Sequence, residues 1–137
     1  LKKNYDYLII DGAPQLAKLA ISAIKAADFI LIPVQPSPYD IWATNDLIEK
    51  IKERQEMRNG LPKAAFVISR AIQNTRLSKE IKEALDQYGI PVLKNKTIQR
   101  VSYPQQALKG KTVLFNKKDP ASKEIVSLTN ELEDFML

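Results

Sequence analysis

The feature that most constrains this fold is a series of short apolar runs, each followed by a segment with helical periodicity. The runs lie at residues 7–10, 29–34 and 64–69. Continuous apolar runs of this length are typical of parallel strands that are covered on both faces. Strands that alternate with helices are joined by crossover connections, which place the strands in one parallel sheet. The sequence therefore predicts a doubly wound, mainly parallel α/β fold.

Residues between the apolar runs show helical periodicity and end signals. We expect helices at 16–27, 41–59, 77–88 and 101–108, and a final one after residue 119. Asp40 and Asp119 are placed to cap the helices that follow them, while Gly60 and Gly89 suit helix C-terminal ends. Residues 91–96 are expected to form a short strand or extended edge. No linker is long enough to suggest a second domain, so residues 1–137 are expected to belong to one domain.

Two residue types are missing from the sequence: the chain contains neither cysteine nor histidine. Disulfides and thiolate metal sites are therefore excluded, and the commonest general base is absent. Any catalysis must use carboxylates, lysine, arginine, hydroxyl groups or a bound metal ion. We see no signal peptide and no apolar run long enough to cross a bilayer. The chain starts at Leu1 and runs at once into an apolar segment, so we expect that residues have been removed upstream.

Basic residues are concentrated in one part of the chain. Seven of the 21 basic residues lie between positions 94 and 118, with no acidic residue among them. These are Lys94, Lys96, Arg100, Lys109, Lys111, Lys117 and Lys118. The rest of the chain is slightly acidic, so the net charge of +5 comes from this run. A local basic surface suits a polyanion, and the alternative is a solvated basic face without a ligand.

Residues 5–11 are expected to form a strand that contains the first apolar run and ends at Asp11. Ligands of open α/β sheets bind beyond the carboxyl ends of the strands. A carboxylate there suits Mg²⁺, a hard cation that keeps several waters. Gly12 would let the backbone approach a bound group, and Pro14 would stiffen the exit. The alternative is that Asp11 only ends a strand or caps the next helix.

Several ordered segments resemble the ParA/MinD-type ATPases, which are deviant P-loop NTPases. Asp11-Gly12-Ala13-Pro14 resembles their Walker B and switch II segment. Residues 28–40 are similar to the next strand and its proline-rich stretch, especially in the small plasmid ParA/ParF group. Residues 66–70 resemble the strand whose end approaches the nucleotide base, and residues 97–111 resemble the late basic segment. The match extends over nearly the whole chain.

The resemblance implies a DNA-segregation (plasmid partition) ATPase that is cytoplasmic and nucleoid-associated. Such a protein forms a nucleotide-sandwich dimer with ATP and Mg²⁺, binds non-specific DNA, and is stimulated by a centromere-binding partner of the ParB or ParG kind. The implied catalytic and metal residue is Asp11, with Mg²⁺ held through water. The implied nucleotide-binding residues are Gly12, Ala13, Pro14, Ser69 and Arg70, and the implied dimer-interface residues are Pro36, Ser37, Pro38 and Asp40. The implied DNA-binding residues are Lys94, Lys96, Arg100, Lys109 and Lys111.

One family motif has no counterpart in this sequence: the glycine-rich phosphate loop with its lysines. Gly110-Lys111-Thr112 lacks the upstream glycine of a P-loop and follows no convincing strand. This chain alone is therefore not expected to hydrolyse ATP, since phosphoryl transfer depends on that loop. We expect the missing portion to be present elsewhere, disordered, or replaced by a contact with another chain.

Other readings remain open. A MinD-like positioning ATPase would use a basic amphipathic C-terminal helix on lipid, whereas residues 130–137 are acidic and predict no membrane partner. The nitrogenase iron protein needs cluster-ligating cysteines, which this chain lacks. A non-catalytic DNA-binding or adaptor module on the same sheet is the alternative from a different class.

Overall fold

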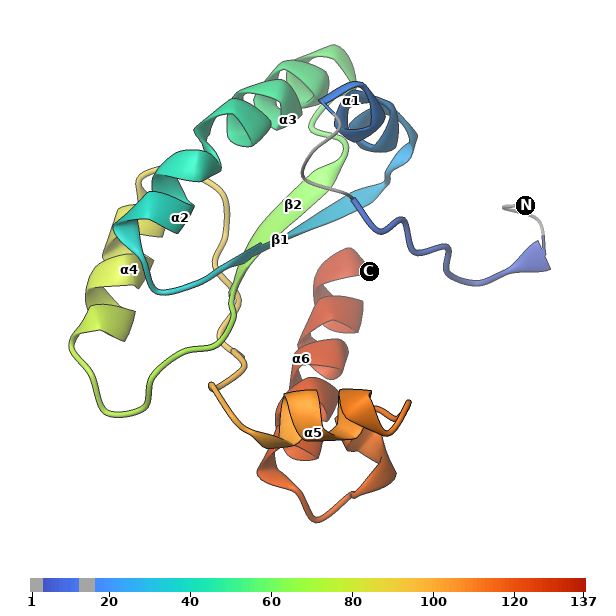
Figure 1. The fold of residues 1–137 in the computed structure, drawn as a ribbon. Coiled ribbons are helices and arrows are strands. Elements are labelled where there is room, and N and C mark those ends of the chain that lie inside the picture. The colour runs from blue at the N-terminus through green and yellow to red at the C-terminus, as the bar shows by residue number, and fades with distance from the viewer. Residues whose placement is uncertain (1–3, 13–16) are drawn as a thin grey trace.

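A computed structural model describes residues 4–12 and 17–137 and shows an α/β arrangement with a parallel sheet (Figure 1). In chain order the elements are α1 (Ala17–Ala26), β1 (Phe29–Val34), α2 (Pro38–Ala43), α3 (Asn45–Met57), β2 (Lys63–Ile68), α4 (Leu77–Asp86), α5 (Ser102–Leu108), the 3-10 turn η2 (Val113–Phe115) and α6 (Pro120–Met136). The predicted strands at 29–34 and 64–69 are confirmed, the second displaced by one residue. The turn at η2 was not predicted.

The sheet is built on the parallel pair β1 and β2, in register from Phe29 opposite Lys63 to Val34 opposite Ile68. The far side of β2 is covered by the extended segment at 91–98, which forms bridges from Val92 to Phe66 and from Ile98 to Ala71. This segment confirms the predicted extended edge. In the described part of the chain, no strand pairs with the other side of β1.

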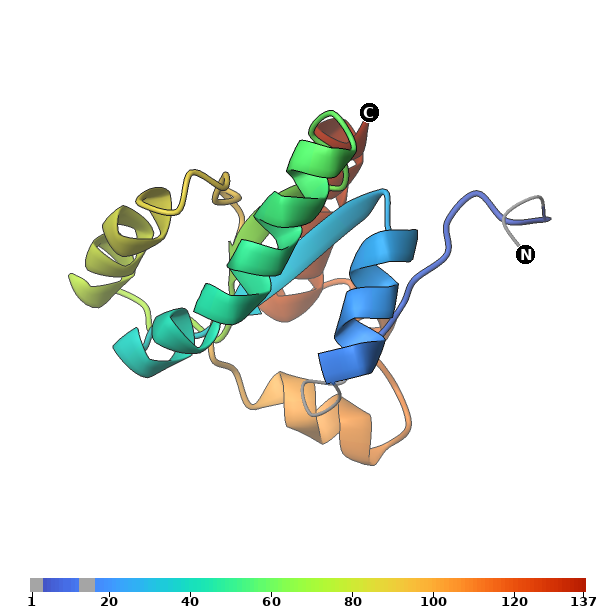
Figure 2. The same ribbon diagram turned by 90° about the horizontal axis from the view of Figure 1, so that it is seen from above.

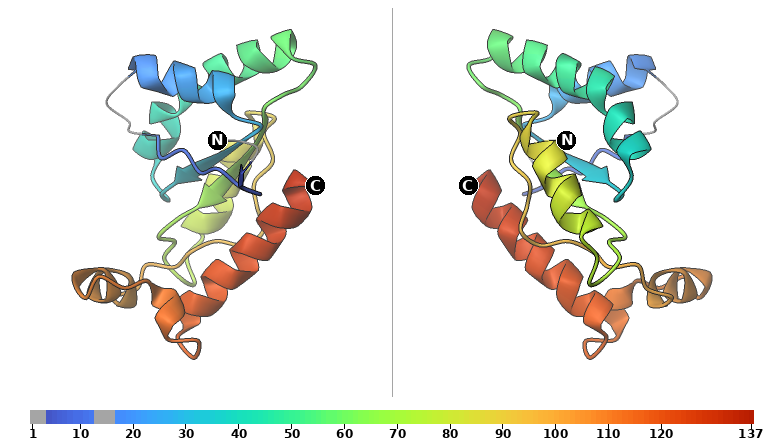
Figure 3. Two further views of the ribbon diagram at one scale, coloured as in Figure 1. Left: turned by 90° about the vertical axis from the view of Figure 1, so that its right-hand side faces the viewer. Right: turned by 90° about the vertical axis from the view of Figure 1, so that its left-hand side faces the viewer.

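Helices cover both faces of the sheet, which confirms the doubly wound arrangement. On one face, β1 and β2 pack against α1, α3 and α4 through buried residues such as Ile24, Ile51 and Leu85. On the other face, Ala65 and Val67 of β2 pack against Leu128 of α6. Figure 3 shows α6 on the opposite side of the sheet from α1 and α3. Alternate residues of β2 thus enter two different cores, as the apolar run predicted.

The strand predicted at residues 5–11 is wrong for this structure. Residues 7–11 have no regular secondary structure, and large apolar or aromatic side chains are exposed at Tyr5, Tyr7, Leu8, Ile9 and Ile10. Ile9 is 92% exposed. A strand forms only where a neighbour satisfies its backbone N–H and C=O groups, and nothing in the described residues does so here. In Figures 1 and 2 the segment runs in the same general direction as β1 without pairing to it.

The single helix predicted at 41–59, with Asp40 as its cap, is also wrong. The chain forms α2 and α3 instead, separated at Thr44, whose hydroxyl donates to the carbonyl of Ile41 at 2.6 Å. The N-cap of α2 is Ser37, and Pro38 occupies the first turn. Proline is favoured at that position because its φ is already helical and its missing N–H has no helical partner. The helix therefore begins before Asp40, which lies within its first turn.

The other end signals are confirmed. The carboxylate of Asp119 accepts a hydrogen bond from the backbone N–H of Ala121 at 2.8 Å and caps α6. Gly60 and Gly89 follow α3 and α4 with φ of 88° and 69°, in the left-handed region that glycine adopts without strain. The last helix packs against the sheet through Leu128, Leu132 and Phe135.

Candidate functional site

The strand-end rim consists of residues 35–40, which follow β1, and residues 69–70, which follow β2. Because the strands are parallel, their carboxyl ends meet at one edge of the sheet. The N–H of Ser69 donates to the carbonyl of Val34 at 2.8 Å and joins the two loops. Arg70 has a φ of 54°, and its N–H donates to the hydroxyl of Thr97 at 3.1 Å. The rim is thus held by hydrogen bonds that backbone N–H groups donate, while the Arg70 residue is exposed.

The loop after β1 makes a tight turn. The N–H of Ser37 donates to the carbonyl of Gln35 at 2.7 Å, and the N–H of Gln35 donates to the carboxylate of Asp40 at 3.3 Å. Asp40 therefore closes the turn that carries Pro36 and Pro38. The structure brings together all the residues assigned to the dimer interface and the two assigned to the nucleotide base.

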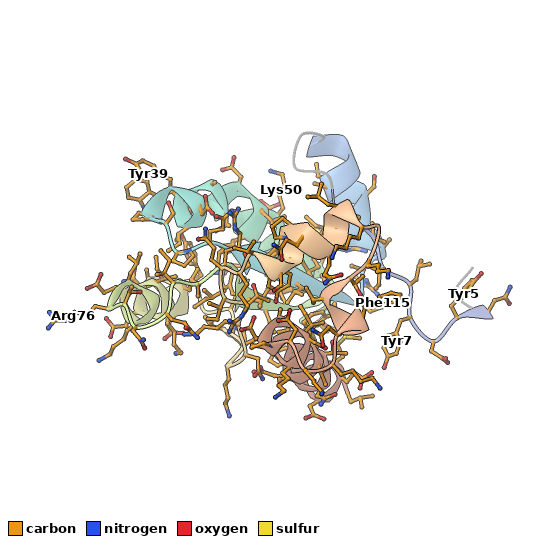
Figure 4. All side chains as sticks on the ribbon, turned by 60° about the horizontal axis from the view of Figure 1, so that its bottom comes forward. Tyr5, Tyr7, Tyr39, Lys50, Arg76 and Phe115 are labelled. Carbon is orange, nitrogen blue, oxygen red and sulfur yellow. The ribbon has the colours of Figure 1, made fainter. Side chains whose placement is uncertain are left out.

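An exposed aromatic pair joins the rim, through Tyr39, to Trp42 of α2. The rings of Tyr39 and Trp42 stand edge to face, with centroids 5.6 Å apart, and the two residues are 76% and 62% exposed. Figure 4 shows Tyr39 pointing away from the body of the molecule. Sequence reasoning did not single out these rings, although helical spacing places them on a face different from that of the buried Ile41.

Asp11 and Gly12 lie at the end of the exposed segment, and both are exposed. Ala13 and Pro14 lie outside the described residues. The Asp11 carboxylate offers hard oxygen donors to a metal ion. Within residues 4–12 and 17–137 there is no group of three or more acidic side chains that could hold a metal. The donor set still fits Mg²⁺, because this ion commonly uses one or two carboxylates and takes its other ligands from water and phosphate.

The structure divides the basic run into two parts. Lys94 and Lys96 are exposed on the segment that runs beside α6, whereas Lys109 and Lys111 are exposed after α5. The ammonium of Lys111 lies 5.0 Å from the ring centroid of Phe115, which is itself 71% exposed. Figure 3 shows α5 projecting to one side of α6, and the hydroxyl of Tyr103 in α5 donates to Glu124 in α6 at 3.2 Å. Lys94 and Lys96 therefore lie beside α6, while Lys109 and Lys111 follow α5.

Two glutamates of α6 hold the segment that carries the first group. The Glu131 carboxylate accepts hydrogen bonds from the backbone N–H of Lys94 at 2.7 Å and from that of Asn95 at 2.8 Å. It also accepts one from the side-chain amide of Asn95 at 2.7 Å. At Lys94 the hydrogen-bond donor is the backbone N–H, and the charge of the ammonium group adds a through-space attraction to the Glu131 carboxylate.

The second glutamate, Glu124, accepts hydrogen bonds from residues 98–103, which follow the same segment. Its carboxylate accepts hydrogen bonds from Nε of Arg100 at 2.8 Å, the N–H of Ile98 at 3.2 Å and the hydroxyl of Tyr103 at 3.2 Å. Burial and the Glu124 carboxylate raise the pKa of Tyr103 to about 12. The hydrogen bond to Glu124 likewise raises the pKa of Arg100. Arg100 is thus already paired with a carboxylate through its side chain.

Sequence reasoning missed both glutamates, although a signal was present. Glu124 and Glu131 are seven residues apart, which places them two turns apart on one face of a helix. Both glutamates lie outside the basic run in the sequence, so a count of charges along the chain did not connect them with the run. Only the packing of α6 against the segment at 94–103 does so.

The hydrogen bonds to Glu131 predict a pH-dependent stability. Burial would raise the pKa of the Glu131 carboxyl, but the donors of Asn95 and Lys94 outweigh burial and lower it. The stabilisation is therefore complete above the ordinary carboxyl pKa and is lost as the pH falls through the lowered value. We expect Glu131→Gln to lower the unfolding temperature at neutral pH, and the difference from wild type to shrink in acid. Thermal unfolding of the intact protein across pH measures this.

The control for that measurement is Glu133→Gln, which removes the same charge from an exposed side chain on the same helix. It should have a smaller effect at neutral pH. Equal effects of the two substitutions at neutral pH would show that the contacts to Lys94 and Asn95 do not stabilise the fold.

Comparison with known proteins connects this arrangement to a family. A family model described as an AAA domain matches residues 1–63. Maintenance of carboxysome distribution protein A of Halothiobacillus neapolitanus is 30% identical over 132 residues, which cover 94% of this chain and 61% of that protein. The sporulation initiation inhibitor protein Soj of Bacillus subtilis is 39% identical over 59 residues, 43% of this chain and 23% of Soj.

A third relative is the ParA family protein MG470 of Mycoplasma genitalium, which is 30% identical over 81 residues, 59% of this chain and 30% of the relative. The chain thus spans less than two thirds of the length of each of these relatives. Across the described part of the chain, no helix is long and apolar enough to cross a membrane.

Proposed function

Because this chain belongs to the ParA/MinD type of P-loop ATPases, we propose that the intact protein is a DNA-segregation ATPase that binds non-specific DNA as an ATP-dependent dimer. The observation that carries the DNA-binding part is the run of exposed lysines between positions 94 and 118, in a chain that is otherwise slightly acidic. Lysines of this kind bind phosphates of any sequence, since they contact the DNA backbone rather than the bases.

The strand-end rim supports the nucleotide-binding part of the proposal. Ser69 and Arg70 would border the base, and the loop from Pro36 to Asp40 would face a second copy of the protein. Asp11 would hold Mg²⁺ through its coordinated water, and Mg²⁺ supplies neutralisation of the phosphate charge when bound. Binding of a centromere-binding partner of the ParB or ParG kind would then stimulate hydrolysis and release the DNA.

The open side of β1 supports a larger sheet in the intact protein. The carbonyls of Asp28 and Val34 face β2, where they accept from Lys63 and Ser69. Backbone groups alternate in direction along a strand, so those of Phe29 and Leu31 point away from β2. A parallel strand from the rest of the protein would pair there and cover the exposed apolar segment at residues 5–10. The P-loop strand of the family is the strand that we propose for this position.

A salt titration of DNA binding tests the proposal. We expect Lys94→Gln/Lys96→Gln in the ATP-bound intact protein to weaken binding to duplex DNA of random sequence. The slope of log affinity against log salt should become less steep by about 0.9 for each phosphate contact that is lost. Fluorescence anisotropy at several salt concentrations measures both quantities.

The matched control is Lys52→Gln/Lys79→Gln, which removes two exposed lysines from α3 and α4. It should leave the slope unchanged. If both double variants have the wild-type slope, the lysines beside α6 do not contact DNA and the DNA-binding proposal fails.

A second candidate function is the positioning of a different cargo by the same ATPase cycle. It is favoured by the relative from Halothiobacillus neapolitanus, which aligns with 94% of this chain and whose name refers to carboxysome distribution. Both functions would use the strand-end rim and the lysines in the same way. Identifying what co-localises with the intact protein in cells, a plasmid centromere or another assembly, distinguishes them.

A further inference from the structure

Arg100 differs from the lysines of the run because its guanidinium forms a hydrogen-bonded ion pair with the carboxylate of Glu124. Two of its nitrogens, Nε and one Nη, donate to the same oxygen of Glu124. The side chains of Arg100 and Glu124 are 25% and 15% exposed, so the pair is partly shielded from water. Shielding strengthens an ion pair relative to one on an open surface.

Glu124 is itself held in position by neutral donors. The N–H of Ile98 and the hydroxyl of Tyr103 bind its second oxygen, each at 3.2 Å. These donors do not depend on Arg100, so the carboxylate stays in position when the arginine leaves. The arginine is the member of the pair that can move, because its guanidinium stands at the end of a long side chain.

A DNA phosphate would present to Arg100 the same chemistry as Glu124. Guanidinium groups bind carboxylate and phosphate oxygens with similar charge-assisted hydrogen bonds. A phosphate that binds Arg100 must therefore displace Glu124 and leave a carboxylate without its cation. Lys94 is held differently: Glu131 accepts a hydrogen bond from its backbone N–H, and the charge of its ammonium group acts on that carboxylate only through space.

We propose that Glu124 is an internal competitor for phosphate at Arg100 and thereby limits the affinity of this surface for DNA. The inference rests on the proposed DNA-binding function. In the wild-type protein, Arg100 stays paired with Glu124 and contributes little to DNA binding, which depends on the lysines. Removal of the carboxylate charge releases Arg100 to contact a phosphate. Glu124 is thus a positioning residue whose removal strengthens binding.

A double-mutant cycle in the ATP-bound intact protein tests this inference. Glu124→Gln should tighten binding to random duplex DNA and steepen the salt slope by about 0.9, the value for one added phosphate contact. Arg100→Gln alone should leave the slope near that of wild type. In the Arg100→Gln background, Glu124→Gln should no longer steepen the slope, because its effect acts through the guanidinium.

Two further variants separate competition from other effects. Glu133→Gln removes the same charge from an exposed position on α6 and reports the general effect of net charge, which should be smaller. Glu124→Asp retains the charge but shortens the reach to Arg100, so a steeper slope in this variant would be independent of net charge. It also keeps the inference testable if Glu124→Gln does not fold.

The outcomes are distinguishable. A wild-type slope in both Glu124 variants, with DNA binding intact, overturns the inference and leaves the proposed function standing. A flatter slope in Arg100→Gln also overturns it, because Arg100 would then already contact phosphate. If the wild-type protein does not bind DNA, the proposed function fails and the inference fails with it.

Discussion

Replacement of Asp11 by asparagine in the intact protein is expected to lower the rate of ATP hydrolysis at least roughly 100-fold, the cost of removing one charge-stabilising group from an active site. Asparagine keeps the size of the side chain and one oxygen, but it lacks the negative charge that attracts Mg²⁺ and its coordinated waters. The initial rate of phosphate release at saturating ATP and Mg²⁺ measures the effect. Nucleotide binding, measured separately, should fall much less than hydrolysis.

Asp6→Asn provides the control for this measurement. Asp6 belongs to the same exposed segment as Asp11 and carries the same charge, but it precedes the apolar residues instead of following them. Its replacement should leave the hydrolysis rate within about twofold of wild type, since surface substitutions away from a site are usually near neutral. Full activity of the Asp11 variant would show that the Asp11 carboxylate is not needed for hydrolysis.

Phe66→Ala is expected to destabilise the protein by about 3–5 kcal/mol, the usual cost of truncating a buried phenylalanine. The side chain is fully buried, with 0% exposed, and its ring centroid lies 6.0 Å from that of Tyr88. Its backbone also joins β2 to the segment at 91–93, since its N–H donates to Pro91 and its carbonyl accepts from Leu93. The truncation would leave a cavity between the sheet and α4.

Phe115→Ala is the matched substitution, because it makes the same chemical change at a ring that is 71% exposed. We expect a change within about 0.5 kcal/mol in the free energy of unfolding, as for most surface positions. Urea denaturation of the intact protein, followed by circular dichroism, gives both values. Similar losses in the two variants would mean that the core is not organised around β2.

The strand ends show how far the candidate site could be predicted. The apolar runs at 29–34 and 64–69 predicted two parallel strands, and parallel strands place their carboxyl ends at one edge. The pattern thus placed the ends of these strands together, whereas the assignment of residues 36–40 and 69–70 to a site came from the resemblance to the ParA/MinD type. Thr97, whose hydroxyl holds the N–H of Arg70, did not, because it comes from a segment far along the chain.

The basic run shows where pattern was insufficient. Counting charges predicted a cationic surface from Lys94 to Lys118, and the structure does expose the lysines of this run. It also pairs Arg100 with Glu124, a residue outside the run. Ion pairs form only when the chain folds. The sequence alone therefore could not show which basic side chains are free to bind a phosphate.

The sequence by itself determined the alternation of strands and helices, the caps at Asp119 and Gly60, and the double-sided burial of β2. These depend on local propensity and on the spacing of apolar residues, which short stretches of chain contain in full. The tertiary structure alone decided that residues 5–11 do not pair with β1. It also decided that Glu124 and Glu131 accept hydrogen bonds from the segment at 94–103, and that Arg100 forms an ion pair with Glu124. These outcomes depend on which groups meet across the fold, and a backbone or side-chain donor has no preferred partner until packing supplies one.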